Sequence, residues 1–171
     1  MSRIRWVLLI VIVLVAAGLS AYLFRASEPV TTPSLPAPIA VLEAPSTANA
    51  LVVYKSPTCG CCADWVDHLE AEGFTVDVHD REDMNTVKAL LGVPRELASC
   101  HTATVGDYVI EGHVAATEIK RLLAEKPTAL GLAVPGMPIG SPGMEMDDKR
   151  MPYDTLLFDR EKATVFASHG E

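Results

Sequence analysis

Apolar and polar positions follow two different periods between residues 51 and 123, and these periods predict strands and helices. Helical spacing with an apolar stripe covers residues 63–72, residues 84–91 and a third segment that carries Ile119, Leu122 and Leu123. Short β-type runs cover residues 51–54, 74–78, 102–105 and 108–110, the last two separated by a Gly-Asp pair typical of a hairpin. The predicted order is β-α-β-α-β-β-α. The helical crossover predicts that the first two strands are parallel, and the hairpin that the last two are antiparallel.

The C-terminal part shows a weaker pattern. Residues 133–146 are rich in Gly, Pro and Met and are predicted to form an irregular loop. Two further β-type runs follow, at residues 155–158 and 164–167. We expect them to extend the sheet or to cover one of its edges.

The N-terminal part is apolar without periodicity. Residues 6–24 contain no charged side chain, and a helix of this length could cross the ~30 Å hydrocarbon layer of a bilayer. Arg3 and Arg5 precede the run, which places the N-terminus in the cytoplasm and the rest of the chain across the membrane. An uncleaved anchor is favoured over a cleaved signal peptide, because the run exceeds the usual ~7–15 apolar residues and lacks a clear cleavage site. In both cases the remainder faces an oxidising compartment.

These changes of composition predict three regions. Residues 1–25 form the anchor or signal segment, and residues 26–50, rich in Pro, Ala, Ser and Thr, form an extended linker with few large side chains. Residues 51–171 form a single domain of ordinary size. The formal net charge of the chain is −8, and the acidic excess lies in the domain. This charge disfavours nucleic acid as a partner, because phosphates require a basic surface.

The stretch SPTCGCCADW places Cys59, Cys61 and Cys62 where the first strand runs into the first helix. A strand followed by Cys-x-x-Cys at a helix N-terminus, in this order of elements, resembles the thioredoxin and glutaredoxin fold. The resemblance implies an α/β domain, a mixed sheet with flanking helices, here with a C-terminal β extension. The turn Ile110-Glu-Gly-His113 has a counterpart in glutaredoxin-like proteins, but Cys100-His101-Thr102 occupies the place of the usual cis-proline.

In this fold the fourth cysteine approaches the other three. Cys59 would lie in the loop above the first strand, Cys62 in the first helical turn, and Cys100 at the start of the third strand. We therefore expect all four sulfurs near one point. Unpaired N–H groups at the helix N-terminus favour a thiolate over a thiol.

Three longer stretches resemble the CopG copper-resistance family over nearly all of residues 51–169. They are VYKSPTCGCCADWVDHLEAEGF, LGVPRELASCHTATVGDYVIEGHV and GLAVPGMPIGSPGMEM. The resemblance implies a periplasmic, thioredoxin-like protein that binds copper through its cysteines. The expected location is therefore the periplasm, with attachment to the inner membrane through residues 6–24 or release after cleavage. The implied partners are copper ions and other periplasmic copper-handling proteins.

The cysteines alone leave three uses open. Two structural disulfides are typical of an oxidising compartment, but Cys59–Cys62 and Cys61–Cys100 bridges would crowd one helical turn. A thiol-disulfide oxidoreductase would attack with Cys59 and resolve with Cys62, which leaves the other two thiols spare. Metal binding would use all four.

For a metal site, the spacing favours several ions over one. A single tetrahedral zinc usually takes its cysteines from two separate pairs, whereas the adjacent Cys61 and Cys62 project in different directions. Sulfurs that diverge but stay close suit bridging thiolates, and soft Cu(I) prefers sulfur. The favoured hypothesis is Cu(I), as a polynuclear cluster, bound by Cys59, Cys61, Cys62 and Cys100. Copper redox activity is an additional hypothesis.

Imidazole and thioether groups also suit copper, so further candidate ligands are His101, Met137, Met144 and Met146. The alternative is that the histidine caps a strand end and the methionines pack on the domain. His113, before the third helix, is predicted to be a cap or a surface group. Trp65 and Met84 are predicted to belong to the core.

Overall fold

A computed structural model of the chain describes residues 49–170. The predicted anchor at residues 1–25 and nearly all of the predicted linker at residues 26–50 lie outside the described residues. Within residues 49–170, the helices are too short or too polar to cross a bilayer.

The described residues form one seven-stranded sheet with three α-helices and a short 3-10 helix, η1. The helical elements are α2 (Gly60–Ala71), α3 (Met84–Leu90), η1 (Arg95–Leu97) and α4 (Ala116–Glu125). The strands are β1 (Ala50–Lys55), β2 (Thr75–Asp80), β3 (Thr102–Val105), β4 (Tyr108–Glu111), β5 (Gly131–Ala133), β6 (Tyr153–Phe158) and β7 (Ala163–His169). The strand order is β2-β1-β3-β4-β5-β6-β7. As predicted, β1 and β2 are parallel, and β3 and β4 are antiparallel.

The predicted α/β class is confirmed, with a mixed sheet, flanking helices and a C-terminal β extension formed by β6 and β7. The more specific likeness to thioredoxin stays a prediction. Strand β5 was not predicted, because its three residues are too few to show a period. This strand pairs with β4 on one side and β6 on the other, and so joins the extension to the sheet.

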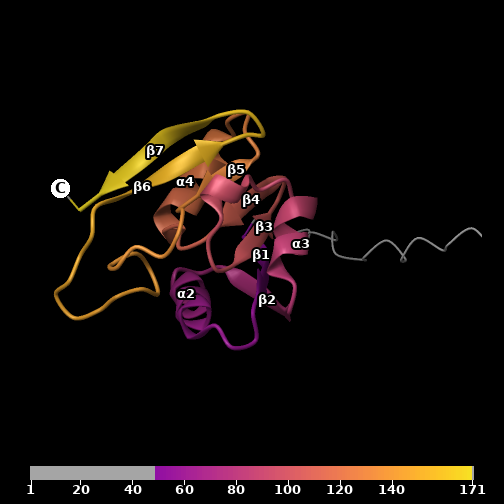
Figure 1. The fold of residues 1–171 in the computed structure, drawn as a ribbon. Coiled ribbons are helices and arrows are strands. Elements are labelled where there is room, and N and C mark those ends of the chain that lie inside the picture. Colours follow the sequence, from indigo (N-terminus) through magenta and orange to yellow (C-terminus); the bar gives the residue numbers. More distant parts are fainter. Residues whose placement is uncertain (1–48, 171) are drawn as a thin grey trace, which may run out of the picture. The chain divides into compact units, whose positions relative to one another are not determined.

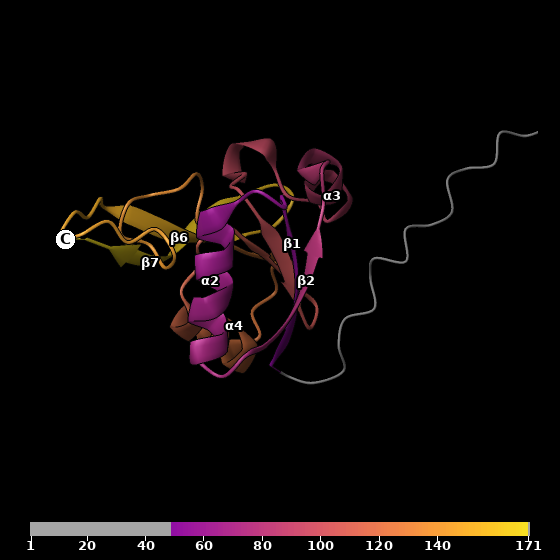
Figure 2. The same cartoon turned by 90° about the horizontal axis from the view of Figure 1, so that it is seen from below.

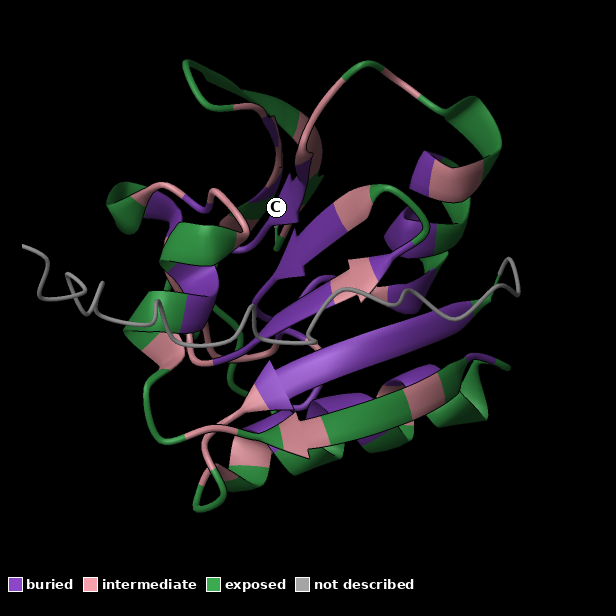
Figure 3. Cartoon of the chain, turned by 90° about the vertical axis from the view of Figure 1, so that its right-hand side faces the viewer, coloured by how far each residue is buried: buried purple, intermediate pink, exposed green. Residues whose placement is uncertain are grey.

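The helices cover both faces of the sheet. Helices α2 and α4 lie on one face and α3 lies on the other (Figures 1 and 2). Trp65 of α2 and Ile119 of α4 belong to the larger apolar core, together with alternate residues of the central strands such as Leu51. Strand β1 is buried along its length, whereas β2 at the sheet edge is largely exposed (Figure 3). The core prediction holds for Trp65, but Met84 is only half-buried.

One helix boundary and the placement of Cys100 differ from the prediction at the cysteines. Helix α2 begins at Gly60, earlier than the predicted residue 63, because Cys59 has extended backbone angles (φ −84°, ψ 101°) and takes the N-cap position. This places Cys61 and Cys62 in the first turn. Strand β3 begins at Thr102, so Cys100 stands in the segment before the strand and not at its first residue.

Candidate metal centre

The four cysteine sulfurs form one cluster, with every Sγ atom within 4.8 Å of the others. The sheet register explains why Cys100 joins the three cysteines near α2. Tyr54, near the end of β1, pairs with Thr102, the first residue of β3, because the two strands are antiparallel. The loop that leaves β1 and the segment that enters β3 therefore meet at one edge of the sheet.

Two of the four cysteines form a disulfide. Cys59 and Cys62 are bonded, while Cys61 and Cys100 are free thiols. The Cys61 sulfur lies 3.5 Å from the Cys59 sulfur. The alternative of two structural disulfides is therefore wrong, because the second bridge is absent. A metal ion would meet four thiolates only after the Cys59–Cys62 bond is reduced.

Two buried imidazoles flank the Cys100 sulfur. His101 Nδ1 lies 3.2 Å from Cys100 Sγ, and His113 Nε2 lies 3.1 Å from it. These three residues form a second group of donor atoms within 4.8 Å of one another. Cys100 belongs to both groups, so its sulfur joins the cysteine cluster to the two histidines.

The prediction of a cap or surface role for His113 is wrong, because this side chain is fully buried beside Cys100. The chain reaches this position through Gly112, whose φ is +71°. A Cβ at Gly112 would lie 2.5 Å from the Ser99 hydroxyl oxygen, so only glycine fits this close approach. A Gly-His pair directly after a strand indicates a tight turn, but it does not indicate which way the His113 imidazole points.

The tautomer of His113 is fixed by a backbone carbonyl. His113 Nδ1 lies 2.8 Å from the carbonyl oxygen of Pro142, which only accepts hydrogen bonds, so Nδ1 carries the proton. The lone pair on Nε2 then faces Cys100. Burial lowers the pKa of His113, which keeps the ring neutral. A neutral imidazole oriented through its second nitrogen is the usual state of a metal-binding histidine.

His101 is neutral for a related reason. Burial first, then the nearby His113 and Lys88, hold its pKa well below the ordinary value. Its ring packs against Trp65, with 4.2 Å between the ring centroids. His101 Nε2 is buried without a hydrogen-bond partner among the described residues, which is uncommon and costly. The ring is thus held by packing and by its Nδ1 contact with Cys100.

The Cys100 thiol is protonated in this state. Burial, followed by the neighbouring Cys61, raises the pKa of Cys100 to about 11. The expected preference for a thiolate concerned the helix N-terminus, and Cys100 lies off it. A metal ion that binds this sulfur must displace a proton, and metal binding commonly does so.

The irregular loop after β5 closes one side of the centre. Gly143, with φ +78°, lies against the first turn of α2, where a Cβ would approach the Trp65 backbone nitrogen to 2.6 Å. Of the predicted methionine ligands, Met137 and Met146 are 53% and 48% exposed, and Met144 is half-buried. Their role as ligands stays a prediction.

The contact at Gly143 leads to a stability prediction. Gly143→Ala should lower the free energy of unfolding by about 2–4 kcal/mol, because it adds a clash with backbone atoms to the cost of a positive φ. Gly136→Ala is the matched control: it has φ +69° in the same loop but no atom within 4 Å of the added Cβ, so it bears only the φ cost. Urea unfolding of both variants measures the difference. An equal decrease in the free energy of unfolding in both variants would contradict the close packing of the loop on α2.

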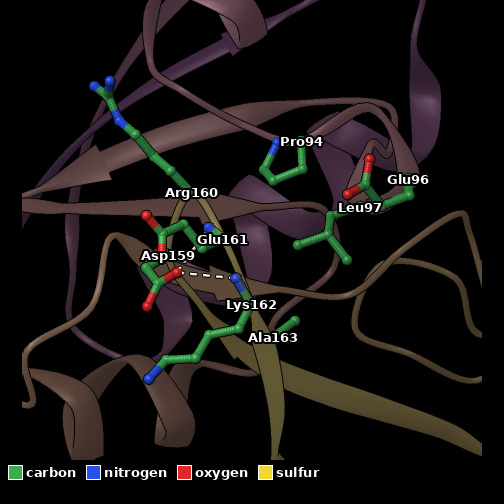
Figure 4. Close-up of a pocket in the computed structure, with 8 residues that line it drawn as sticks. All are labelled: Pro94, Glu96, Leu97, Asp159, Arg160, Glu161, Lys162 and Ala163. Carbon is green, nitrogen blue, oxygen red and sulfur yellow. Dashed lines mark hydrogen bonds between the residues drawn. The ribbon is translucent and has the colours of Figure 1, made fainter.

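A pocket elsewhere on the domain offers no comparable chemistry. It lies between η1 and the turn that joins β6 to β7, with Asp159 and Glu96 among its lining residues (Figure 4). No cysteine or histidine lines it, and its volume of about 120 Å³ is well below the ~300–1,000 Å³ of usual small-molecule sites.

Comparisons with known proteins are consistent with the cysteine cluster. A family model described as a protein of unknown function, DUF411, matches residues 97–144, which include Cys100, His101 and His113. No curated protein matches the chain. Two solved structures, described as forms 1 and 2 of copper resistance protein CopG, are similar to it. Form 1 is 44% identical with a TM-score of 0.69, and the match covers 73% of this chain and 100% of that one. Form 2 is 45% identical with a TM-score of 0.68, over 71% and 98% of the two chains.

Proposed function

The chain belongs to the CopG copper-resistance family, and from this premise we propose that it binds copper through its four cysteines and serves copper resistance. The observation that carries the proposal is the gathering of four Sγ atoms within 4.8 Å of one another. Thiolates are soft ligands and select Cu(I) over harder ions, and imidazole also suits copper. The protein would hold the metal as cargo or substrate.

Several ions fit the donor set better than one. Three of the sulfurs come from positions 59–62 at the start of one helix, whereas a single tetrahedral zinc usually takes its cysteines from two separate pairs. Cys100 belongs to both the four-sulfur group and the group with His101 and His113, which suits a sulfur that bridges neighbouring ions. These features support a polynuclear Cu(I) cluster, with the two imidazoles as ligands at its edge.

The disulfide adds a redox hypothesis. Reduction of the Cys59–Cys62 bond takes two electrons and yields two thiolates. Two Cu(I) ions supply these electrons when they become two Cu(II) ions, and the reverse reaction forms the disulfide while it reduces two Cu(II) to two Cu(I). We propose that the protein interconverts the two copper oxidation states through this balanced exchange.

The experiment that tests copper binding is elemental analysis of the whole chain from cells grown with added copper, followed by anaerobic Cu(I) titration of the reduced protein. We expect more than one copper per chain. A matched sample whose thiols are reduced and then alkylated should retain none. Zinc in place of copper, or equal metal in both samples, would contradict the proposal.

A thiol-disulfide oxidoreductase is the second candidate, favoured by the observed Cys59–Cys62 disulfide. Cys59 is partly exposed and Cys62 is buried, as expected of an attacking and a resolving cysteine. Reduction of insulin separates the two candidates. Activity that survives Cys61→Ser and is unaffected by chelators would favour the oxidoreductase over copper binding.

The proposed location is the periplasm, with residues 6–24 as the membrane anchor. Their apolar sequence and the cysteine-rich site support it. Recovery of the chain in the membrane fraction after alkaline extraction would support the anchor, whereas release of a shortened chain would support cleavage.

A further inference from the structure

A buried ion pair lies next to the segment that carries Cys100 and His101. Lys88 of α3 and Glu111 of β4 are 7% and 0% exposed, and Lys88 Nζ lies 2.6 Å from Glu111 Oε1. Helix α3 covers the sheet face opposite α2 (Figure 2). The pair therefore lies across the sheet from the Cys-x-Cys-Cys turn.

Stability alone does not account for such a pair. Removing two charges from water costs several kcal/mol for each ion, and apolar residues of similar volume are often as stable or more stable. Neither charge is left unsatisfied here. What distinguishes this pair is the set of other groups that its carboxylate holds.

The Glu111 carboxylate accepts three hydrogen bonds. Besides Lys88, the Ser99 backbone N–H donates to Oε1 at 2.6 Å, and the Thr102 hydroxyl donates to Oε2 at 2.7 Å. Lys88 also donates to the Thr102 hydroxyl at 2.9 Å, which closes the network. Ser99 and Thr102 immediately precede and follow the Cys100-His101 pair. One carboxylate thus holds both ends of the segment that presents Cys100 Sγ and His101 Nδ1.

Neighbouring contacts complete this support. The residue after Glu111 is Gly112, whose N–H donates to the His101 carbonyl oxygen at 3.1 Å. The Ser99 hydroxyl donates to the carbonyl oxygen of Gly136 in the loop after β5. His113 follows Gly112 and is two peptide bonds from Glu111, while His101 is connected to Glu111 through Gly112 and its hydrogen bond.

We propose that Glu111 is a positioning residue for the metal centre, which fixes residues 99–102 so that Cys100 meets the other sulfurs. Lys88 neutralises the buried carboxylate. The proposal deepens the proposed function, on which its copper-binding part rests. A glutamine at this position has one acceptor oxygen and one NH2 donor, so it cannot accept from Ser99, Thr102 and Lys88 together.

The reactivity of the Cys100 thiol tests the positioning without any metal. In the unreduced whole chain carrying Cys61→Ser, Cys100 is the one free thiol, and its alkylation rate is followed by mass spectrometry. Glu111→Gln should raise this rate about tenfold or more, because losing hydrogen bonds to a buried charge frees the segment to open. Glu118→Gln is the matched control, since Glu118 is also buried but binds Thr155 and His169. It should leave the rate within about twofold of the parent.

A second variant and a second readout keep the test decisive. Thr102→Val removes one of the three hydrogen bonds while it keeps the side-chain volume, and it should raise the rate by a smaller factor; it replaces Glu111→Gln if that variant does not fold. In folded, reduced protein Glu111→Gln should weaken Cu(I) binding about 10–100-fold, as loss of an outer-shell partner does. Glu118→Gln should leave the affinity unchanged.

The outcomes separate the two proposals. Equal alkylation rates in Glu111→Gln and Glu118→Gln would overturn the positioning role, whatever happens to copper. A faster rate in Glu111→Gln, in a chain whose parent binds no copper, would support the positioning of Cys100 and overturn the proposed function. A faster rate together with weaker copper binding supports both.

Discussion

Cys100→Ser is expected to weaken Cu(I) binding by more than about 100-fold, beyond the 10–100-fold that loss of an outer-shell partner costs. The Cys100 sulfur belongs to both donor groups of the centre, so its removal affects the four-sulfur cluster and the histidine pair together. The serine hydroxyl is a hard donor and a poor ligand for Cu(I). Anaerobic titration of the reduced chain against a competing Cu(I) chelator measures both the affinity and the number of ions bound.

Cys61→Ser is the matched control for this experiment. It removes a sulfur from the four-sulfur group alone and leaves Cys100 with His101 and His113. We expect Cys61→Ser to lose fewer ions than Cys100→Ser. A Cys100→Ser chain that retained full stoichiometry and affinity would exclude this cysteine as a ligand and remove the main support for a shared centre.

Local patterns account for the parts of the fold and site that the sequence could predict. The strand and helix periods are local, and so are three of the four cysteines, which lie within one helical turn. The approach of Cys100 was expected from the resemblance to the thioredoxin fold, and in the structure the antiparallel pairing of β1 and β3 brings residues near Tyr54 and Thr102 together. The expected meeting of the four sulfurs therefore depended on the fold resemblance and not on a local pattern.

The missed features depend on contacts between distant segments. The position of His113 requires a turn at Gly112 and the carbonyl of Pro142, which belongs to a loop without a period. Lys88 follows a helical pattern in which a lysine usually marks the solvated face, yet here it is buried against Glu111. The oxidation state of Cys59 and Cys62 depends on geometry and on the compartment.

The junction between the sheet and its C-terminal extension also contributes to the geometry of the metal centre. Strand β5 is the sole strand of the described sheet that connects β4 to the β6–β7 hairpin. It also leads into the loop whose Pro142 carbonyl orients His113. A substitution that separates β4 from β5 should therefore affect both the stability of the domain and the geometry of the metal centre.

Gly131→Ala should push β5 away from β4. We expect it to lower the free energy of unfolding by about 3 kcal/mol or more, which is at or above the upper end of usual overpacking costs. Gly131 pairs with Val109 of β4, and a Cβ at this position would lie 1.7 Å from the Val109 carbonyl oxygen. The obstacle is backbone, so no side-chain rotation relieves it. Urea unfolding followed by circular dichroism gives the change, and the Cu(I) affinity of the folded fraction should fall with it.

Gly60→Ala provides the control for Gly131→Ala. Gly60 is the first residue of α2, and nothing lies within 4 Å of its added Cβ. Replacing this glycine should be neutral or stabilising by up to about 1 kcal/mol, because alanine loses less backbone freedom on folding. If Gly131→Ala unfolded at the same urea concentration as Gly60→Ala, the close pairing of β4 and β5 would be wrong. The extension could then not be what holds the His113 loop in place, and its link to the metal centre would fail with it.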